Sequence, residues 1–145
     1  MFMYFSKSKY TAFWQCPKII WLDKYRPEEK EIDDGELKRM ASGNIVDDLT
    51  MTLFGDFTEV TTFDGDGKLN LDEMKRKTAE CIDDGVENIC EASFDCNGLY
   101  CAADILRKEN GGYAIYEVKS STKLKQYYFS HLITVELVID FLFHC

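Results

Sequence analysis

Residues 99–119 place the tightest constraint on how this chain can fold. The runs 99–106 and 113–119 are short and rich in apolar and aromatic residues, and Asn110-Gly111-Gly112 lies between them. Asparagine and glycine tolerate the positive φ angles that a tight turn requires. The pattern therefore predicts a β-hairpin.

Three charged residues interrupt the apolar strands of this hairpin: Asp104 in the first strand, and Glu117 and Lys119 in the second. Side chains alternate between the two faces of a strand, so Glu117 and Lys119 point to the same side. If Lys108 pairs with Tyr113, counting back places Asp104 opposite Glu117, with Cβ atoms roughly 5 Å apart. The sequence therefore predicts two adjacent carboxylates with a lysine beside them.

A second hairpin signal lies directly upstream. Residues 87–95 have the pattern of a strand, and Asn97-Gly98 is a strong signal for a two-residue turn. Pairing across this turn places Glu91 opposite Asp104, so that Glu91, Asp104 and Glu117 form a row across three adjacent strands. Like charges directly opposite each other destabilise a sheet, and a divalent cation that prefers oxygen ligands is the natural compensation.

The order of Asp104, a hairpin and then Glu117-Val118-Lys119 matches the D-(x)n-E-x-K signature of the PD-(D/E)XK nuclease superfamily. The flanking residues resemble the RecB-type and Cas4-like branch, in particular a group of bacterial RecB-like proteins. The resemblance spans residues 6 to about 137. The flanking motifs are Ser6-Lys7-Ser8-Lys9-Tyr10, Cys16-Pro17-Lys18, Trp21-Leu22, Ala103-Asp104-Ile105-Leu106 and the segment from Tyr116 to Thr122.

This resemblance implies an α/β fold with a restriction-endonuclease-like core, in which helices flank a central mixed β-sheet. It implies one nuclease-like domain over residues 1–145, lacking elements at its C-terminal side. The implied activity is metal-dependent hydrolysis of DNA, in the manner of an exonuclease. DNA would be the partner. The sequence shows no signal peptide and no apolar run long enough to span a membrane, which predicts a cytoplasmic protein.

The resemblance also implies roles for residues of the site. Asp104, Glu117 and the backbone carbonyl of Val118 would hold Mg²⁺ or Mn²⁺, and Glu91 is a candidate further ligand through water. Lys119 would orient the attacking water or stabilise the charge that develops on the phosphate.

Lys123 and Lys125 are candidates for contact with DNA phosphates. Other features favour a second function class, an inactive nuclease-fold module that binds nucleic acid or a protein partner. The net charge of −9 is the opposite of the usual basic footprint of a nucleic-acid-binding protein. Asp47 stands where many RecB-type nucleases carry a histidine, and Val135 stands where relatives often carry a glutamine.

The chain has six cysteines but no C-x-x-C motif, so a zinc or redox site has no local support. Without a secretory signal, we expect reduced thiols. Several Cas4-like relatives hold an iron–sulfur cluster through a cysteine of the early Cys-Pro motif, which Cys16 matches. A cluster needs about four thiolates, so we expect none in this chain, and Cys16 is a candidate ligand only in a longer one.

Residues 62–73 suggest a third function class, an EF-hand-like calcium binder. Two features argue against it: position 1 of the motif is Thr62 in place of aspartate, and residues 57–61 are β-prone where an EF-hand requires a helix. The residues that fit positions 3, 5, 6, 8 and 12 of the motif are Asp64, Asp66, Gly67, Leu69 and Glu73.

The remaining periodic segments predict helices. We expect the aromatic residues of the first helical segment to lie in the core, and the apolar stripe of the second to face inward. Asn70 is expected to cap the third helix and Gly85 to end it. The four segments are 6–25, with a break at Pro17, 37–54, 71–84 and 128–143.

Overall fold

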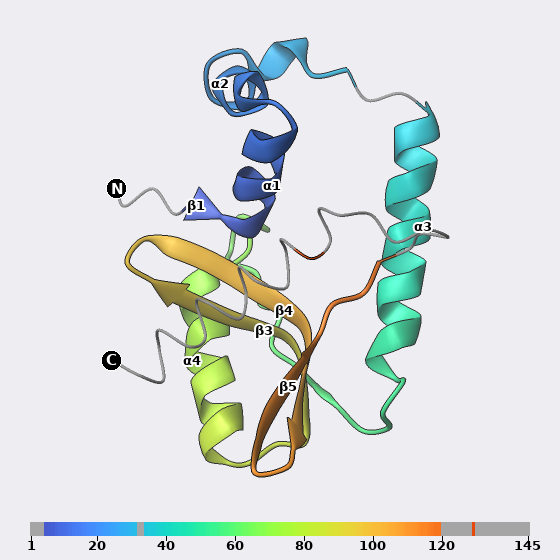
Figure 1. The fold of residues 1–145 in the computed structure, drawn as a ribbon, viewed down its shortest axis with the longest axis vertical. Coiled ribbons are helices and arrows are strands. Elements are labelled where there is room, and N and C mark those ends of the chain that lie inside the picture. The colour runs from blue at the N-terminus through green and yellow to red at the C-terminus, as the bar shows by residue number, and fades with distance from the viewer. Residues whose placement is uncertain (1–4, 32–33, 120–128, 130–145) are drawn as a thin grey trace.

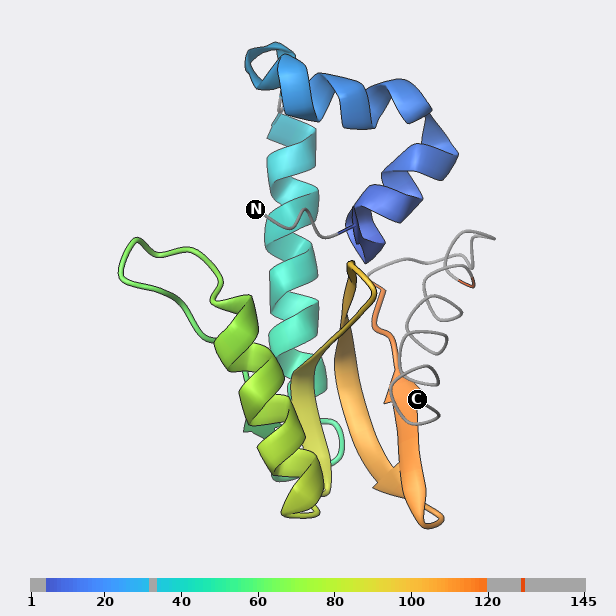
Figure 2. The same ribbon diagram turned by 90° about the vertical axis from the view of Figure 1, so that its left-hand side faces the viewer.

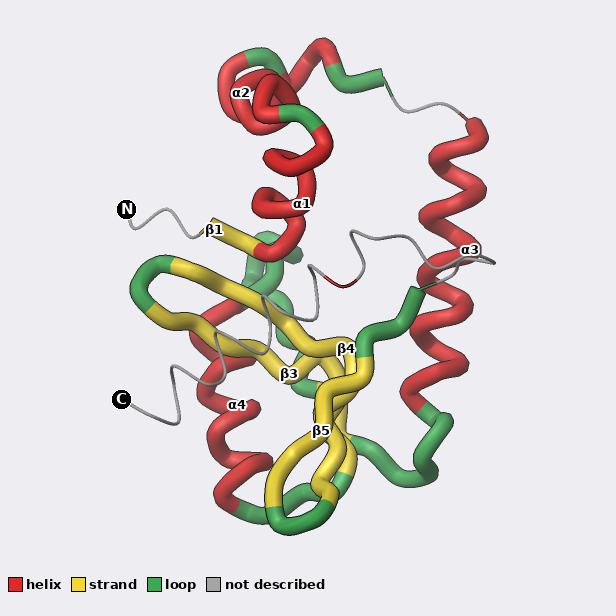
Figure 3. The backbone as a smooth tube through the Cα atoms, in the orientation of Figure 1, coloured by secondary structure: helices red, strands yellow, loops and turns green. Residues whose placement is uncertain are grey.

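A computed structural model describes residues 5–31, 34–119 and 129 of the chain (Figure 1). Among the described residues, most helices come first in the sequence and the long strands come last, as the colours of Figure 1 show, and Figure 3 distinguishes the helices (red) from the strands (yellow). In chain order the elements are β1 (Phe5–Ser6), α1 (Lys7–Gln15), α2 (Pro17–Tyr25), the short 3-10 helix η1 (Pro27–Glu29), α3 (Asp34–Met51), β2 (Thr58–Glu59), α4 (Leu71–Asp83), β3 (Asn88–Cys96), β4 (Leu99–Glu109) and β5 (Gly112–Tyr116).

The five strands in the described part of the chain form one mixed sheet, and helices flank it. β3, β4 and β5 form an antiparallel meander, whereas β1 joins β4 and β2 joins β3 in parallel. The fold is therefore α/β with a mixed sheet, as the sequence predicted at that level of detail.

Both hairpin registers are confirmed. Cys96 pairs with Leu99 across the first turn, and Lys108 pairs with Tyr113 across the second. The second loop is tighter than predicted, with only Asn110-Gly111 between the paired strand ends. Both of these residues have positive φ, at 50° and 82°, which asparagine and glycine tolerate better than other residues do.

Helix α4 covers one face of the meander, as Figure 2 shows from the side. Its buried residues Met74 and Thr78 are one turn apart, and the partly buried Ile82 continues the same stripe. The strands contribute alternating apolar side chains to the core beneath the helix. The buried core cluster consists of Val60, Ile89, Ala92, Phe94, Cys101, Ala103 and Leu106.

Helix α4 begins and ends where the sequence predicted. The side-chain oxygen of Asn70 accepts a hydrogen bond from the backbone N–H of Glu73 at 3.1 Å, which satisfies one of the unpaired donors of the first turn. After the last turn, Gly85 adopts a positive φ of 70°, which releases the chain toward β3.

Replacing Asn70 with alanine should therefore lower the free energy of unfolding by about 1 kcal/mol, because it removes the cap. Urea denaturation followed by circular dichroism measures this change. Asn70→Asp is the matched control and should stay close to the wild type, since aspartate is an equally good N-cap. Equal stability of the alanine variant and the wild type would show that the cap contributes nothing.

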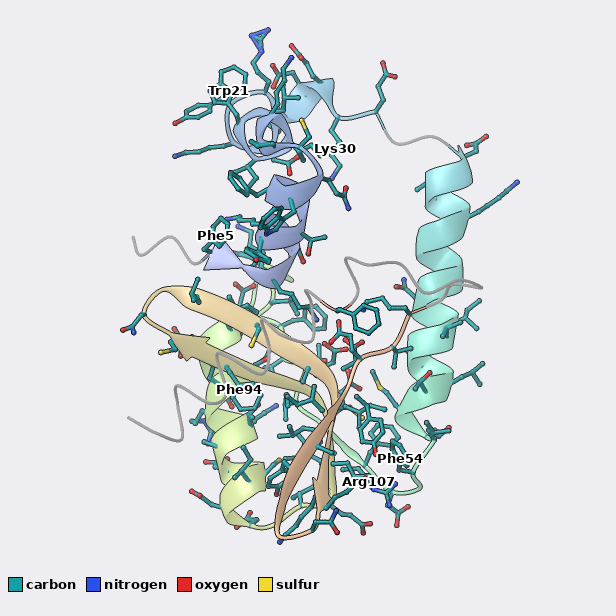
Figure 4. The ribbon with its side chains drawn as sticks, viewed as in Figure 1. Phe5, Trp21, Lys30, Phe54, Phe94 and Arg107 are labelled. Atoms are coloured by element: carbon teal, nitrogen blue, oxygen red, sulfur yellow. The ribbon has the colours of Figure 1, made fainter. Side chains whose placement is uncertain are left out.

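Helices α1, α2 and α3 lie away from this core, and the prediction that their apolar residues face inward is wrong. No residue of α1 or α2 is buried, both helices being fully described, and Trp14 is 68% exposed. Figure 4 shows Trp21 at the outer end of this helical arm. In α3, Ile45 and Leu49 are exposed as well. Helical periodicity identifies an apolar stripe but does not say what covers it.

The chain returns to the sheet just after α3, at Phe54. The ring of Phe54 packs against the guanidinium group of Arg107, 4.2 Å from the ring centroid, and against the ring of Tyr116, with centroids 4.8 Å apart. Figure 4 labels Phe54 and Arg107 at this junction. This contact anchors the lower end of α3 to β4 and β5.

Several predicted features lie outside the described residues. These are Lys123, Lys125, Val135 and all of the apolar segment 128–143 except Phe129. Within the described residues, no helix combines the length and the apolar character needed to cross a membrane.

Candidate functional site

The edge of β4 that faces away from β3 is only partly paired. Along this edge β4 pairs with β1 at Leu99 and Tyr100, and with β5 from Ile105 onward. Among the described residues, no strand pairs with residues 101–104 on this side. The gap lies between β1 and β5 in the sheet and ends at Asp104.

Asp104 meets the chain that leaves β5 at one end of this gap. The backbone N–H of Val118 donates a hydrogen bond to Oδ2 of Asp104 at 2.6 Å. The Lys119 ammonium group donates to Oε1 of Glu117 at 2.8 Å and lies 3.7 Å from Oδ2 of Asp104. The structure thus brings Asp104, Glu117 and Lys119 together, as the hairpin register predicted.

The Lys119 ammonium group contacts more than the two carboxylates. It also donates a hydrogen bond of 2.7 Å to the backbone carbonyl of Val118. A carboxylate oxygen of Glu117, the carbonyl oxygen of Val118 and, at a greater distance, a carboxylate oxygen of Asp104 therefore surround a single positive charge.

Lys7 is the site residue that sequence reasoning missed. It is the first residue of α1, and its ammonium group donates to Oε1 of Glu117 at 2.5 Å and to the carbonyl oxygen of Ala102 at 3.1 Å. Ala102 lies in the unpaired stretch of the β4 edge, so Lys7 fills part of the gap. The Ser6-Lys7-Ser8-Lys9 motif was visible in the sequence, but nothing in its spacing linked it to a strand about a hundred positions away.

The position of Lys7 follows from β1 and from the N-cap of α1. β1 is anchored to β4 by the pairing of Phe5 with Leu99, and the N–H of Phe5 donates to the carbonyl of Gly98 at 2.8 Å. Ser6 then caps α1 by accepting from the backbone N–H of Lys9 at 3.3 Å. The helix therefore starts directly beside the gap, which puts its first side chain within reach of the site.

The charged side chains of this site are largely buried. The side chain of Glu117 is 1% exposed, and those of Lys7 and Lys119 are 15% and 29% exposed. Burial raises the pKa of Asp104, and the nearby Glu117 carboxylate raises it further. Lys7, Lys119 and the Val118 N–H act in the opposite direction without cancelling the rise. At a given pH, Asp104 is therefore less readily ionised than a free aspartate.

Glu91 does not join Asp104 and Glu117 in a three-carboxylate cluster. Among the described residues, no three His, Cys, Asp or Glu side chains are close enough to hold a metal ion together. Glu91 has the correct register position, because the pairs on either side of it continue toward Asp104. However, its φ is 57°, and this left-handed backbone breaks the alternation of side chains along β3. Its charge acts instead on Cys90, whose thiol pKa burial raises to about 11 with a further contribution from Glu91.

The proposed EF-hand loop is a tight turn in which one carboxylate binds its own backbone. Oδ1 of Asp64 accepts hydrogen bonds from the backbone N–H groups of Asp66 and Lys68, both at 2.9 Å. Phe63 and Leu69 form an antiparallel bridge that closes the turn. Backbone donors thus occupy one of the oxygens that a calcium site would need.

The described cysteines are dispersed. Cys16 is exposed between α1 and α2, whereas Cys90 and Cys101 are buried in the sheet. Among the described residues, Cys16 belongs to no group of side chains that could hold a metal ion.

A scan against protein-family models, a search of curated proteins and a search of solved structures each found no match for this chain.

The donor set at the end of the gap suits a hard divalent cation. Carboxylate and carbonyl oxygens are the ligands that Mg²⁺ and Mn²⁺ prefer. The oxygens of Glu117 and Val118 already converge on one cation, the Lys119 ammonium group, with Asp104 nearby. The residues present therefore fit a metal ion, provided that the lysine side chain moves aside.

Proposed function

We propose that this chain is a metal-dependent DNA nuclease of the PD-(D/E)XK type. The observation that carries the proposal is the position of the Lys119 ammonium group, which contacts Glu117 and the Val118 carbonyl and lies 3.7 Å from Asp104. A positive charge thus lies among the oxygens that the motif resemblance assigns to the metal ion. Burial and the neighbouring Glu117 carboxylate raise the pKa of Asp104, and carboxyl groups with perturbed pKa values are common at functional sites.

Each residue would have a distinct role. Asp104, Glu117 and the carbonyl of Val118 would hold Mg²⁺ or Mn²⁺, which supplies a polarised phosphate and a water of lowered pKa when bound. Lys119 is tethered next to these ligands, so its ammonium group stays within reach of the water or the phosphate after it moves aside. There it would stabilise the negative charge that develops on the phosphate.

Cleavage of labelled DNA tests the proposal directly. We expect the protein, or a longer version of the chain, to degrade linear single- or double-stranded DNA in Mg²⁺ or Mn²⁺ but not in EDTA. Circular single-stranded DNA without ends is the matched substrate control, and its survival would indicate an exonuclease. If folded protein leaves every substrate intact in both metals, the nuclease proposal fails.

One observation favours the alternative of an inactive nuclease-fold module. Lys7 and Lys119 both contact Oε1 of Glu117, so two ammonium groups balance the two carboxylates of the site without any metal. Under this alternative the four side chains form a structural network. Binding of DNA or a protein partner without metal-dependent cleavage would support it.

A further inference from the structure

Lys7 is the feature of the site that the D-(x)n-E-x-K signature does not include. It reaches Glu117 from a position 110 residues away in the sequence, and its side chain is only 15% exposed. Its ammonium group shares Oε1 of Glu117 with Lys119, which lies just two residues beyond Glu117. A second lysine on one carboxylate oxygen requires an explanation, because holding a lysine in place costs side-chain entropy.

The charges of the site change when a divalent cation binds. Among Asp104, Glu117, Lys7 and Lys119, two negative charges face two positive charges. A divalent cation held by the two carboxylates leaves both ammonium groups without these partners. Lysines close to a bound cation repel it, so they are stable there only when further negative charge arrives. A DNA backbone supplies that charge, one per phosphate.

We propose that Lys7 is a second lysine of the nuclease site that holds Glu117 in the metal-free protein and transfers to a DNA phosphate when the metal binds. The inference rests on the proposed function. It assigns Lys7 a positioning role before metal binding and a phosphate-binding role after it. The contact with Ala102 supports this assignment, because it holds the lysine at the gap in the described pairing of the β4 edge, beside the residues that would bind the metal.

Metal titration distinguishes this role from a purely structural one. Lys7→Met removes the charge and keeps most of the alkyl chain. We expect it to tighten Mn²⁺ binding, measured by isothermal titration calorimetry, by about tenfold, because a charge-assisted hydrogen bond no longer competes for Glu117. Loss of a merely structural lysine would loosen the site and weaken Mn²⁺ binding.

Two further variants control the measurement. Lys7→Arg keeps the positive charge and the hydrogen-bond donors. Its Mn²⁺ affinity should therefore stay within about twofold of the wild-type value. Lys18→Met removes an exposed lysine of α2 and should leave Mn²⁺ affinity unchanged. Circular dichroism confirms that each variant is folded.

DNA binding tests the second half of the proposal. In a Lys119→Ala background, in which we expect cleavage to be about 10²–10³-fold slower, Lys7→Met should weaken the binding of a fluorescent oligonucleotide in Mn²⁺. It should also reduce the slope of log affinity against log salt by about one, as the loss of one phosphate contact predicts. Lys18→Met in the same background should keep both values.

The outcomes separate this inference from the proposed function. If the wild type binds Mn²⁺ but folded Lys7→Met binds it equally or more weakly, the inference about Lys7 is overturned and the nuclease proposal stands. Tighter Mn²⁺ binding with unchanged DNA affinity and salt slope overturns the phosphate-binding role. If the wild type binds no Mn²⁺, both the proposed function and the role of Lys7 are overturned.

Discussion

Replacing Lys119 with alanine is expected to reduce metal-dependent DNA cleavage by about 10²–10³-fold, the usual loss when one stabilising group is removed from a transition state. The same change should not weaken Mn²⁺ binding. A protonated lysine cannot be a metal ligand, and in the structure its ammonium group occupies the space among Glu117, Val118 and Asp104. Cleavage rates and calorimetric Mn²⁺ affinities, measured on the same preparations, test both parts.

Glu117→Gln is the comparison variant that separates loss of chemistry from loss of metal binding. It keeps the size of the side chain but removes a charge that both Lys7 and Lys119 contact. We expect it to lose cleavage and metal affinity together, since it removes a ligand. Equal loss of metal binding in Lys119→Ala would show that the lysine acts on the fold of the site and not on the chemistry.

The second large effect concerns metal binding and stability. Ligands that bind only the native state stabilise it, so Mn²⁺ at about 100 times its Kd should raise the melting temperature on the order of 10 °C. Asp104→Asn should abolish most of this rise, because the amide lacks the charge that favours the cation. It still offers an oxygen to the Val118 N–H. Differential scanning calorimetry with and without Mn²⁺ measures the shift.

Without metal, Asp104→Asn should have the opposite effect on stability. The pKa of Asp104 is raised in the folded protein above its ordinary value of 3.8. The ionised carboxylate therefore costs stability at neutral pH, and this cost is relieved as the pH falls through the raised pKa. The metal-free asparagine variant should be more stable than the wild type at pH 7, and the difference should shrink on acidification.

The control for these measurements is Asp66→Asn, in the exposed turn that resembles an EF-hand. We expect it to keep the full metal-induced rise in melting temperature. If Asp104→Asn keeps the rise and Asp66→Asn loses it, the ion binds in the turn and the site at the end of β5 is not the metal site.

Much of the sheet was predictable because it is built from local signals. The two turns are encoded by Asn97-Gly98 and Asn110-Gly111, and each turn fixes the register of the strands beside it. Alternation along the strands then brings Asp104 and Glu117 together. The same local logic predicted the cap of α4 at Asn70.

The failures occur where the structure depends on long-range packing or on one unusual residue. Alternation along β3 predicts that Glu91 lies beside Asp104 and Glu117, but a positive φ at Glu91 breaks this alternation. Positive φ is uncommon for glutamate, so the sequence does not predict it. The exposed faces of α1 to α3 were predicted to be buried, because periodicity does not reveal an element's neighbours. Lys7 was missed because the parallel pairing of β1 with β4 has no local sequence signal.

The parallel pairing of β1 with β4 also has a consequence for the order of folding. Asp104, Glu117 and Lys119 belong to a meander whose contacts are short-range, so they can assemble early. Lys7 reaches Ala102 and Glu117 across 95 and 110 residues, and a loop of this length must close before β1 gains its few hydrogen bonds. We therefore expect the acidic residues of the site to come together first and Lys7 to dock last, beside a strand that pairs with β4 only through Phe5 and Ser6.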